Sequence, residues 1–116
     1  MNFKQMVSCA EEISQKTLGE LPPEVRSAVA EVPIFFEAVP SAQDVAEGID
    51  PETLGLFDPG PEAAPMACIR LWLENIWYEA GDAGTTFDEE VRITLLHEIG
   101  HFLGWDEDEV EDRGLA

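Results

Sequence analysis

The sequence predicts a small α+β fold, in which helices near both ends of the chain flank three short strands. Its length of 116 residues suits one domain, residues 1–116, and leaves no room for two independent cores. The hydrophobic content of 45% is ordinary for a globular protein, so the net charge of −19 does not indicate disorder. Segments with helical spacing of apolar residues alternate with short runs of β-branched and aromatic residues, which favours a mixed fold.

The first half of the chain predicts three helices. Apolar residues recur at helical spacing over residues 3–18, and Gly19 supplies a stop. A short second helix is expected over residues 21–30, because proline is tolerated in a first turn. Residues 41–48 predict a third helix with Ser41 as its N-cap.

Three further segments predict strands, because they are rich in β-branched and aromatic residues and bounded by proline or glycine. These segments are residues 32–39, 53–57 and 67–73. Prolines and a glycine between Asp58 and Pro65 predict a loop. For residues 74–80, periodicity does not decide between strand and helix.

Residues 86–103 predict the longest helix near the C-terminus. Thr86 and Glu89 have the spacing of a capping box, and Gly104 is the expected stop. Apolar residues cover one broad arc of this helix, whereas His97 and His101 lie on the opposite side. We therefore expect a helix with a buried back and a front that carries both histidines, with Thr94 and Glu90 beside them.

That front contains the pattern H-E-x-x-H, formed by His97, Glu98 and His101. Histidines at i and i+4 stand one turn apart, about 6 Å along the axis, so both imidazoles can reach one zinc ion. Glu98 is offset by about 100° around the helix and can lie beside the metal, where a general base takes a proton from water. The alternative interpretation is two ordinary histidines on an amphipathic helix.

A third zinc ligand is expected from the acidic run after Gly104. The two histidines are the only ones in the chain, and neither cysteine is suitably placed. A catalytic zinc ion usually takes three protein ligands and keeps one position open. We expect Glu107 as the third ligand, with Asp106 and Asp108 as alternatives.

The motif extends to H-E-x-x-H-x-x-G-x-x-E, which resembles the extended metzincin pattern with Glu107 in the third-ligand position. No methionine follows position 66, so the methionine turn of metzincins is absent from the sequence. The sequence instead resembles the bacterial mini-zincins over most of its length, through LPPEV, LGLF, CIRLWLENI and above all EEVRITLLHEIGHFLG. This resemblance implies a compact zincin-like domain with a small mixed sheet of three to four strands beside the active-site helix. It also implies zinc between His97, His101 and an acidic residue after Gly104.

We therefore expect a zinc-dependent metallopeptidase in which Glu98 is the general base. The strand at Ile69–Leu73 is the first choice for pairing with an extended substrate. Tyr78 is expected in the core, or as an oxyanion donor if it faces the cleft. The alternative function is a non-catalytic metal-binding or protein-interaction module, because so short a chain can scarcely build both walls of a cleft. A partner protein that completes the cleft is a third possibility.

Charge defines the expected partners. Six dispersed basic residues exclude a phosphate-binding patch for nucleic acid or an anionic membrane, and no stretch approaches the roughly 20 apolar residues of a membrane helix. The negative field instead favours cations, including basic peptides and proteins as substrates. Cys9 and Cys68 stand alone and are expected as reduced, buried thiols, which suggests the cytoplasm.

Overall fold

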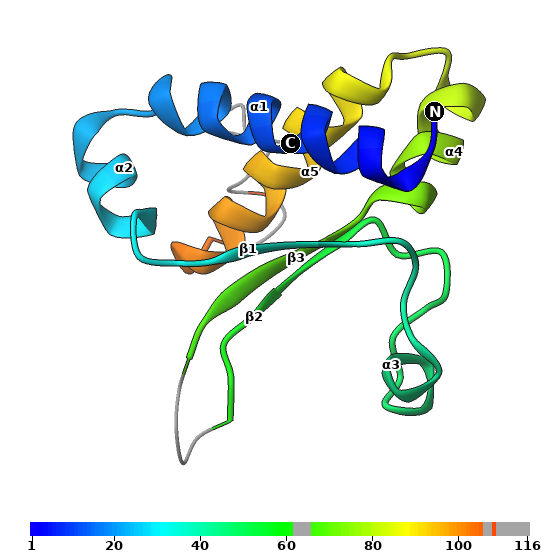
Figure 1. Ribbon diagram of the computed structural model, residues 1–116. Helices are drawn as coiled ribbons and strands as arrows, with labels where there is room; N and C mark the ends of the chain where they lie inside the picture. Colours follow the sequence, from blue (N-terminus) through cyan, green and yellow to red (C-terminus); the bar gives the residue numbers. More distant parts are fainter. Residues whose placement is uncertain (62–65, 106–107, 109–116) are drawn as a thin grey trace.

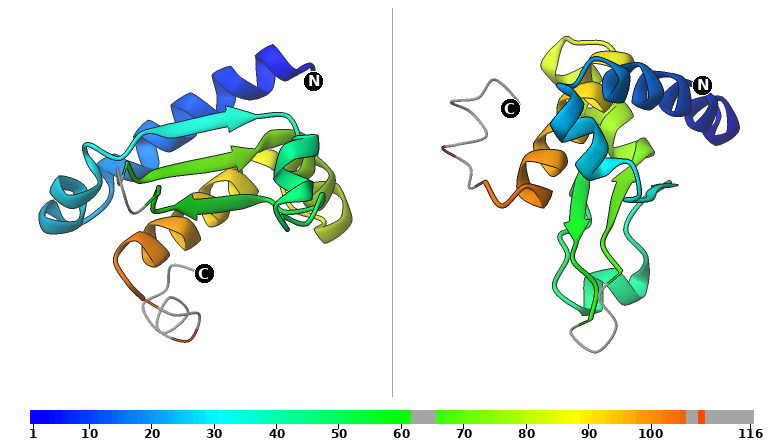
Figure 2. Two further views of the ribbon diagram at one scale, coloured as in Figure 1. Left: turned by 90° about the horizontal axis from the view of Figure 1, so that it is seen from below. Right: turned by 90° about the vertical axis from the view of Figure 1, so that its left-hand side faces the viewer.

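A small mixed sheet carries helices on one face in the computed structural model, which describes residues 1–61, 66–105 and 108 (Figure 1). Four of the helices in this part of the chain lie over that face, and α3 lies beyond the opposite face at one end (Figure 2). The helices are α1 (Phe3–Gly19), α2 (Pro23–Val29), α3 (Ala42–Ala46), α4 (Leu73–Ala83) and α5 (Phe87–Phe102), and the strands are β1 (Ile34–Glu37), β2 (Gly55–Asp58) and β3 (Cys68–Trp72). The predicted α+β class and the mixed sheet are confirmed.

The sheet has the strand order β1-β3-β2 within the described residues, so β3 is its central strand. β1 runs parallel to β3, and β2 runs antiparallel to it. The expectation that Ile69–Leu73 offers a free edge is therefore wrong, because β3 is paired on both sides. A short apolar segment is compatible with a central strand and with an edge strand, so the composition of this segment did not distinguish the two positions in the sheet. Among the described strands, β1 and β2 are the edge strands.

The core lies between the sheet and the helices. Ile69 and Leu71 of β3 are buried against α5, whose residues Val91, Leu95 and Ile99 form its fully buried back. Alternation along β3 sends these two side chains to the helical face and Arg70 to the other. α5 also contacts α1, α4 and β2, so it occupies the centre of the molecule.

Arg70 ties α3 to the outer face of the sheet. Its guanidinium donates to Glu37 of β1 at 2.8 and 2.9 Å and to Asp44 of α3 at 2.7 and 3.0 Å. It also lies 4.9 Å from the centroid of the Trp72 ring. The hydrogen bonds from Arg70 hold the pKa of the Asp44 carboxyl well below its usual range. This ion-pair cluster joins two strands and a helix that are far apart in sequence.

The remaining predicted elements agree in type and differ at their ends. Residues 74–80, which periodicity left open, lie in α4, where Ile76 and Ala80 are buried one turn apart. α4 continues through Gly81 to Ala83, and its C-cap Gly84 has a left-handed φ of 72°. The Asp58–Pro65 loop is described only in part, because residues 62–65 lie outside the described residues.

The start of α5 shows half of the predicted capping box. The Thr86 hydroxyl accepts from the Glu89 amide at 3.1 Å, but the Glu89 carboxylate does not return a bond to the Thr86 amide. Gly104 has a φ of 83°, as expected for the stop. Cys9 and Cys68 are free thiols that are half-buried, and burial together with Asp58 raises the pKa of Cys68. In the described part of the chain, no helix combines the length and the apolar content needed to cross a membrane.

Candidate metal centre and active site

The front of α5 is partly covered by β2. Glu90, Thr94 and Glu98 lie on this side of the helix, and their exposed fractions are only 8%, 6% and 7%. His97 and His101 are half-buried. The predicted buried back is thus confirmed, but the front is a narrow region between α5 and the edge strand.

Two imidazoles and one carboxylate meet in this region. The His97 and His101 rings have centroids 4.6 Å apart and planes at 87° to each other. Ligand atoms of His97, Glu98 and His101 all lie within 4.8 Å of one another, and the described residues form no other such cluster. The pair predicted from the sequence is therefore brought together around a volume that suits one cation.

Hydrogen bonds orient the two rings as metal ligands. The Nδ1 atom of His101 lies 3.2 Å from the Trp105 carbonyl oxygen, which can only accept, so this nitrogen donates its proton. The neutral ring then carries its lone pair on Nε2. His97 Nδ1 lies 3.0 Å from Glu98 Oε2, a contact that favours the same tautomer. Oxygen acceptors at Nδ1 are the usual outer support of zinc-binding histidines, so the donor set fits zinc.

The Glu98 carboxylate is held by the edge strand. Its Oε1 atom accepts from the Phe57 amide at 2.8 Å, and its Oε2 atom contacts His97. The Ile69 amide donates to Pro33 on the β1 side. Phe57 stands opposite Ile69 in the antiparallel pair, so its N–H and C=O point away from β3. Gly55, two residues earlier, has the same orientation. The free edge of β2 therefore passes directly over Glu98.

Gly55 allows this close approach of β2 and α5. A Cβ atom at position 55 would lie 2.7 Å from Thr94 Cγ2, well inside ordinary contact. Sequence reasoning missed both this contact and the Phe57 amide. A glycine inside a strand pattern is a known sign of close backbone approach, so Gly55 carried a signal. A backbone amide carries none.

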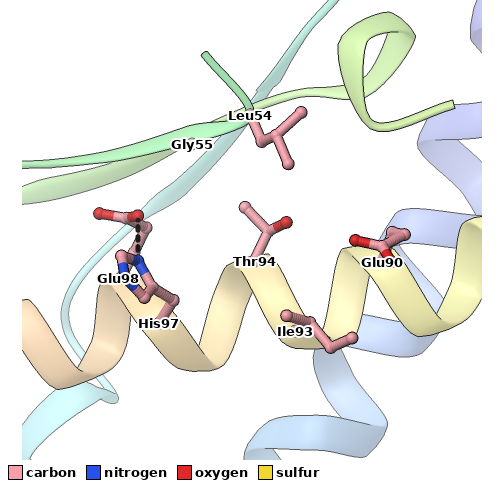
Figure 3. Close-up of a pocket in the computed structure, with 7 residues that line it drawn as sticks. All are labelled: Leu54, Gly55, Glu90, Ile93, Thr94, His97 and Glu98. Carbon is pink, nitrogen blue, oxygen red and sulfur yellow. Dashed lines mark hydrogen bonds and ion pairs between the residues drawn. The ribbon is translucent and has the colours of Figure 1, made fainter. Parts of the chain in front are cut away.

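A pocket of about 330 Å³ adjoins the histidine cluster (Figure 3). Its walls come from α5 and from the start of β2. The residues that line it are Leu54, Gly55, Glu90, Ile93, Thr94, His97 and Glu98. Because it touches His97 and Glu98 directly, anything bound in it lies next to the candidate metal centre.

The other predicted site residues are separated from this cluster or lie outside the described residues. Asp106 and Glu107, the expected third ligand, fall outside the described residues. Asp108 is exposed and is not part of the His97 cluster. Tyr78 is 69% exposed on α4 and lines a different hollow, so neither the core nor the oxyanion expectation holds. A tyrosine side chain suits either a core or a surface position, and on α4 the ring of Tyr78 faces outward.

Two histidines one turn apart, with a glutamate beside the first, define a metal-hydrolase type of site on a buried helix. The family model of the zincin-like metallopeptidases matches residues 29–115, most of the chain. The chain belongs to this family, which confirms the resemblance to small zincins. Zinc is the metal that zincins normally use, and their substrates are peptides or proteins.

Comparison with solved structures finds a similar fold in a conserved hypothetical protein from Thermo thermophilus. The two chains are 24% identical with a TM-score of 0.58, and the match covers 89% of this chain and 94% of the other. At this identity the likeness concerns the fold. A comparison with curated proteins finds no match.

Proposed function

We propose that this protein hydrolyses peptide bonds with zinc, and that Glu98 is its general base. The observation that carries the proposal is the meeting of His97, Glu98 and His101 at the free edge of β2. Membership of the metallopeptidase family supports the reaction class.

His97 and His101 would hold the ion through Nε2, and Glu107 would complete the set of ligands. When bound, zinc would supply a Lewis acid that lowers the pKa of water and polarises a carbonyl. Both histidines come from one helix, so their spacing is fixed before any metal arrives. Glu107 follows the turn at Gly104, where the left-handed backbone ends α5 and redirects the chain.

Glu98 would take a proton from the attacking water and then give it to the leaving amine. Its carboxylate lies within the histidine cluster, where one ligand atom of each of the three residues lies within 4.8 Å of the others. The Phe57 amide fixes the orientation of this carboxylate at 2.8 Å. The base would therefore be positioned by the strand that borders the cleft.

An extended substrate would lie along the outer edge of β2. Gly55 turns its N–H and C=O away from β3, and Phe57 turns its C=O the same way, so these groups can pair with a second strand while the Phe57 N–H stays on Glu98. Side chains of the substrate would then reach the pocket lined by Leu54 and Thr94. The net charge of −19 favours cationic peptides among the candidates.

A second function, a non-catalytic metal-binding or interaction module, is favoured by one observation. Both oxygens of Glu98 are engaged, one by the Phe57 amide and the other by His97. A module of this kind would bind zinc through the same histidines and leave peptides intact. The two functions thus differ in cleavage and agree in metal binding.

The test replaces Glu98 by glutamine in zinc-loaded protein. Cleavage of a mixture of chemically unfolded proteins is followed by mass spectrometry, and zinc content by elemental analysis. We expect cleavage to fall by about 10²–10⁴-fold, the usual contribution of a general base, while zinc stays near one ion per chain. The matched control is Glu89→Gln on the same helix, which should cleave normally.

Undiminished cleavage by Glu98→Gln would remove this residue as the base. If the unaltered protein holds one zinc ion and cleaves none of the unfolded proteins, the module becomes the better interpretation.

A further inference from the structure

The pocket beside the metal centre has a buried acid at its far end. The exposed fraction of Glu90 is only 8%, and Figure 3 shows its carboxylate directed along α5 toward Thr94. The Thr85 hydroxyl donates to Oε1 at 2.8 Å. No other side-chain hydrogen bond reaches this carboxylate within residues 1–61 and 66–105. A buried carboxylate with an oxygen turned toward a cavity favours a ligand that brings a donor.

The rest of the pocket suits an aliphatic chain. Leu54, Ile93 and the methyl group of Thr94 form its walls, and the described residues that line it include no lysine or arginine. Its volume of about 330 Å³ is at the small end of ligand pockets, enough for one long side chain. Lysine and arginine combine an apolar stem with a cationic head, which matches apolar walls that end at a carboxylate.

We propose that this pocket binds a lysine or arginine side chain of the substrate, and that Glu90 determines this specificity. The proposal rests on the proposed function, because it names the substrate class of the same site. Glu90 would meet the cationic head, and Leu54 and Ile93 would cover the stem. Glu90 touches the substrate in this account but takes no part in the chemistry.

Antiparallel pairing of the substrate with β2 would assign the bound side chain to one side of the cleaved bond. Gly55 lies against Thr94, and Phe57 lies against Glu98 farther along α5, so β2 and α5 run the same way. A substrate antiparallel to β2 runs from the Phe57 end to the Gly55 end. The residue that follows the cleaved bond then lies over the pocket. Cleavage should therefore create new amino termini that begin with lysine or arginine.

Acidic side chains continue beyond the pocket in the same direction. Leu54 also borders a second hollow of about 230 Å³, whose lining in the described part of the chain contains Glu52, Glu79 and Asp82 and no basic residue. Asn75 donates to the Pro51 and Thr53 carbonyls and so fixes this segment. Positive charge farther along the substrate would meet a favourable field there.

The experiment measures binding and cleavage separately. Two fluorescent peptides share one sequence except at the residue expected in the pocket, which is lysine in one and uncharged norleucine in the other. Their affinities for zinc-loaded Glu98→Gln protein are measured by fluorescence anisotropy. The salt concentration is about 0.15 M, at which interactions between exposed charges are largely screened. We expect the lysine peptide to bind at least about tenfold more tightly, as a buried charge pair would produce. Adding Glu90→Gln should bring this ratio close to one, because glutamine keeps the acceptor for Thr85 and removes the charge. Adding Glu89→Gln, which changes net charge equally but lines a different hollow, should leave the ratio intact.

Cleavage sites in unfolded proteins give the second readout. The unaltered protein should produce new amino termini enriched in lysine and arginine, and Glu90→Gln should lose that enrichment. The specificity would be overturned if the lysine and norleucine peptides bind with nearly equal affinity. It would also be overturned if Glu90→Gln and Glu89→Gln change the ratio of these affinities alike. Lysine-selective binding without any cleavage would contradict the proposed function alone, and cleavage without the preference would contradict the specificity alone.

Discussion

Replacing Gly55 by alanine tests the close contact between β2 and α5 on which the site depends. The new Cβ atom would lie 2.7 Å from Thr94 Cγ2 and 3.1 Å from Leu71 Cδ2. Carbon atoms in contact are about 3.5 Å apart or more, so the strand and the helix must separate by about 0.8 Å. The bond from the Phe57 amide to Glu98 would lengthen from 2.8 Å to about 3.6 Å, beyond hydrogen-bond range.

Gly55→Ala should therefore lower the free energy of unfolding by about 1–3 kcal/mol, the usual cost of overpacking. Urea denaturation followed by circular dichroism measures this change. Peptide cleavage should fall at the same time, because Glu98 loses its support. Thr94→Ser removes the clashing methyl group, so the double variant should be more stable than the sum of the two single effects predicts.

Gly81→Ala is the matched control for Gly55→Ala. Gly81 lies within α4, and a Cβ atom there would meet nothing within 4 Å. This change should raise stability by about 0.5–1 kcal/mol, because alanine favours helix more than glycine. If Gly55→Ala is as stable as the unaltered protein, or Thr94→Ser recovers none of the loss, the close-contact argument is refuted.

The remaining predictions concern the metal and the ion-pair cluster. His97→Ala or His101→Ala should abolish stoichiometric zinc in elemental analysis, and Glu107→Ala should weaken zinc affinity by about 10–100-fold; unchanged affinity would transfer the third-ligand role to another residue. Arg70 lowers the pKa of Asp44 from its ordinary 3.8, so this pair stabilises the fold above that pH and the stabilisation is lost as the pH falls below it. Thermal melts from about pH 7 to about pH 3 should show that Asp44→Asn is less stable than the unaltered protein at neutral pH. Its melting temperature should also fall less steeply as the pH decreases, and parallel curves of melting temperature against pH would contradict this account.

The helices were predictable where local signals agreed. α5 combined a broad apolar arc, the Thr86 cap and the Gly104 stop, and all three are present in the structure. Residues 74–80 lacked such agreement. Their helical state follows from the burial of Ile76 and Ala80, which is a tertiary effect.

The pairing of the strands was not predictable from composition. β1 pairs with β3 and not with β2, the next strand in sequence. The composition of an apolar segment does not indicate which strands it pairs with. The same limit explains the wrong choice of Ile69–Leu73 as the edge. The residues of the candidate site were predictable only where they lie on one element. His97, Glu98 and His101 were predictable because one helix sets their spacing, whereas the contact of Glu98 with Phe57 joins residues 41 positions apart.

One helix supplies the acid of the pocket, both histidines and the carboxylate between them, at intervals fixed by the helical repeat. The distances between these groups are therefore fixed by the helix, and a shift of α5 along its axis moves all of them together. β2 contacts this helix at Thr94 and Glu98, so a displacement of the strand changes those contacts while the spacing along α5 is kept. Substitutions in the segments before Gly55 and after Asp58 should therefore act on the candidate site through the position of β2.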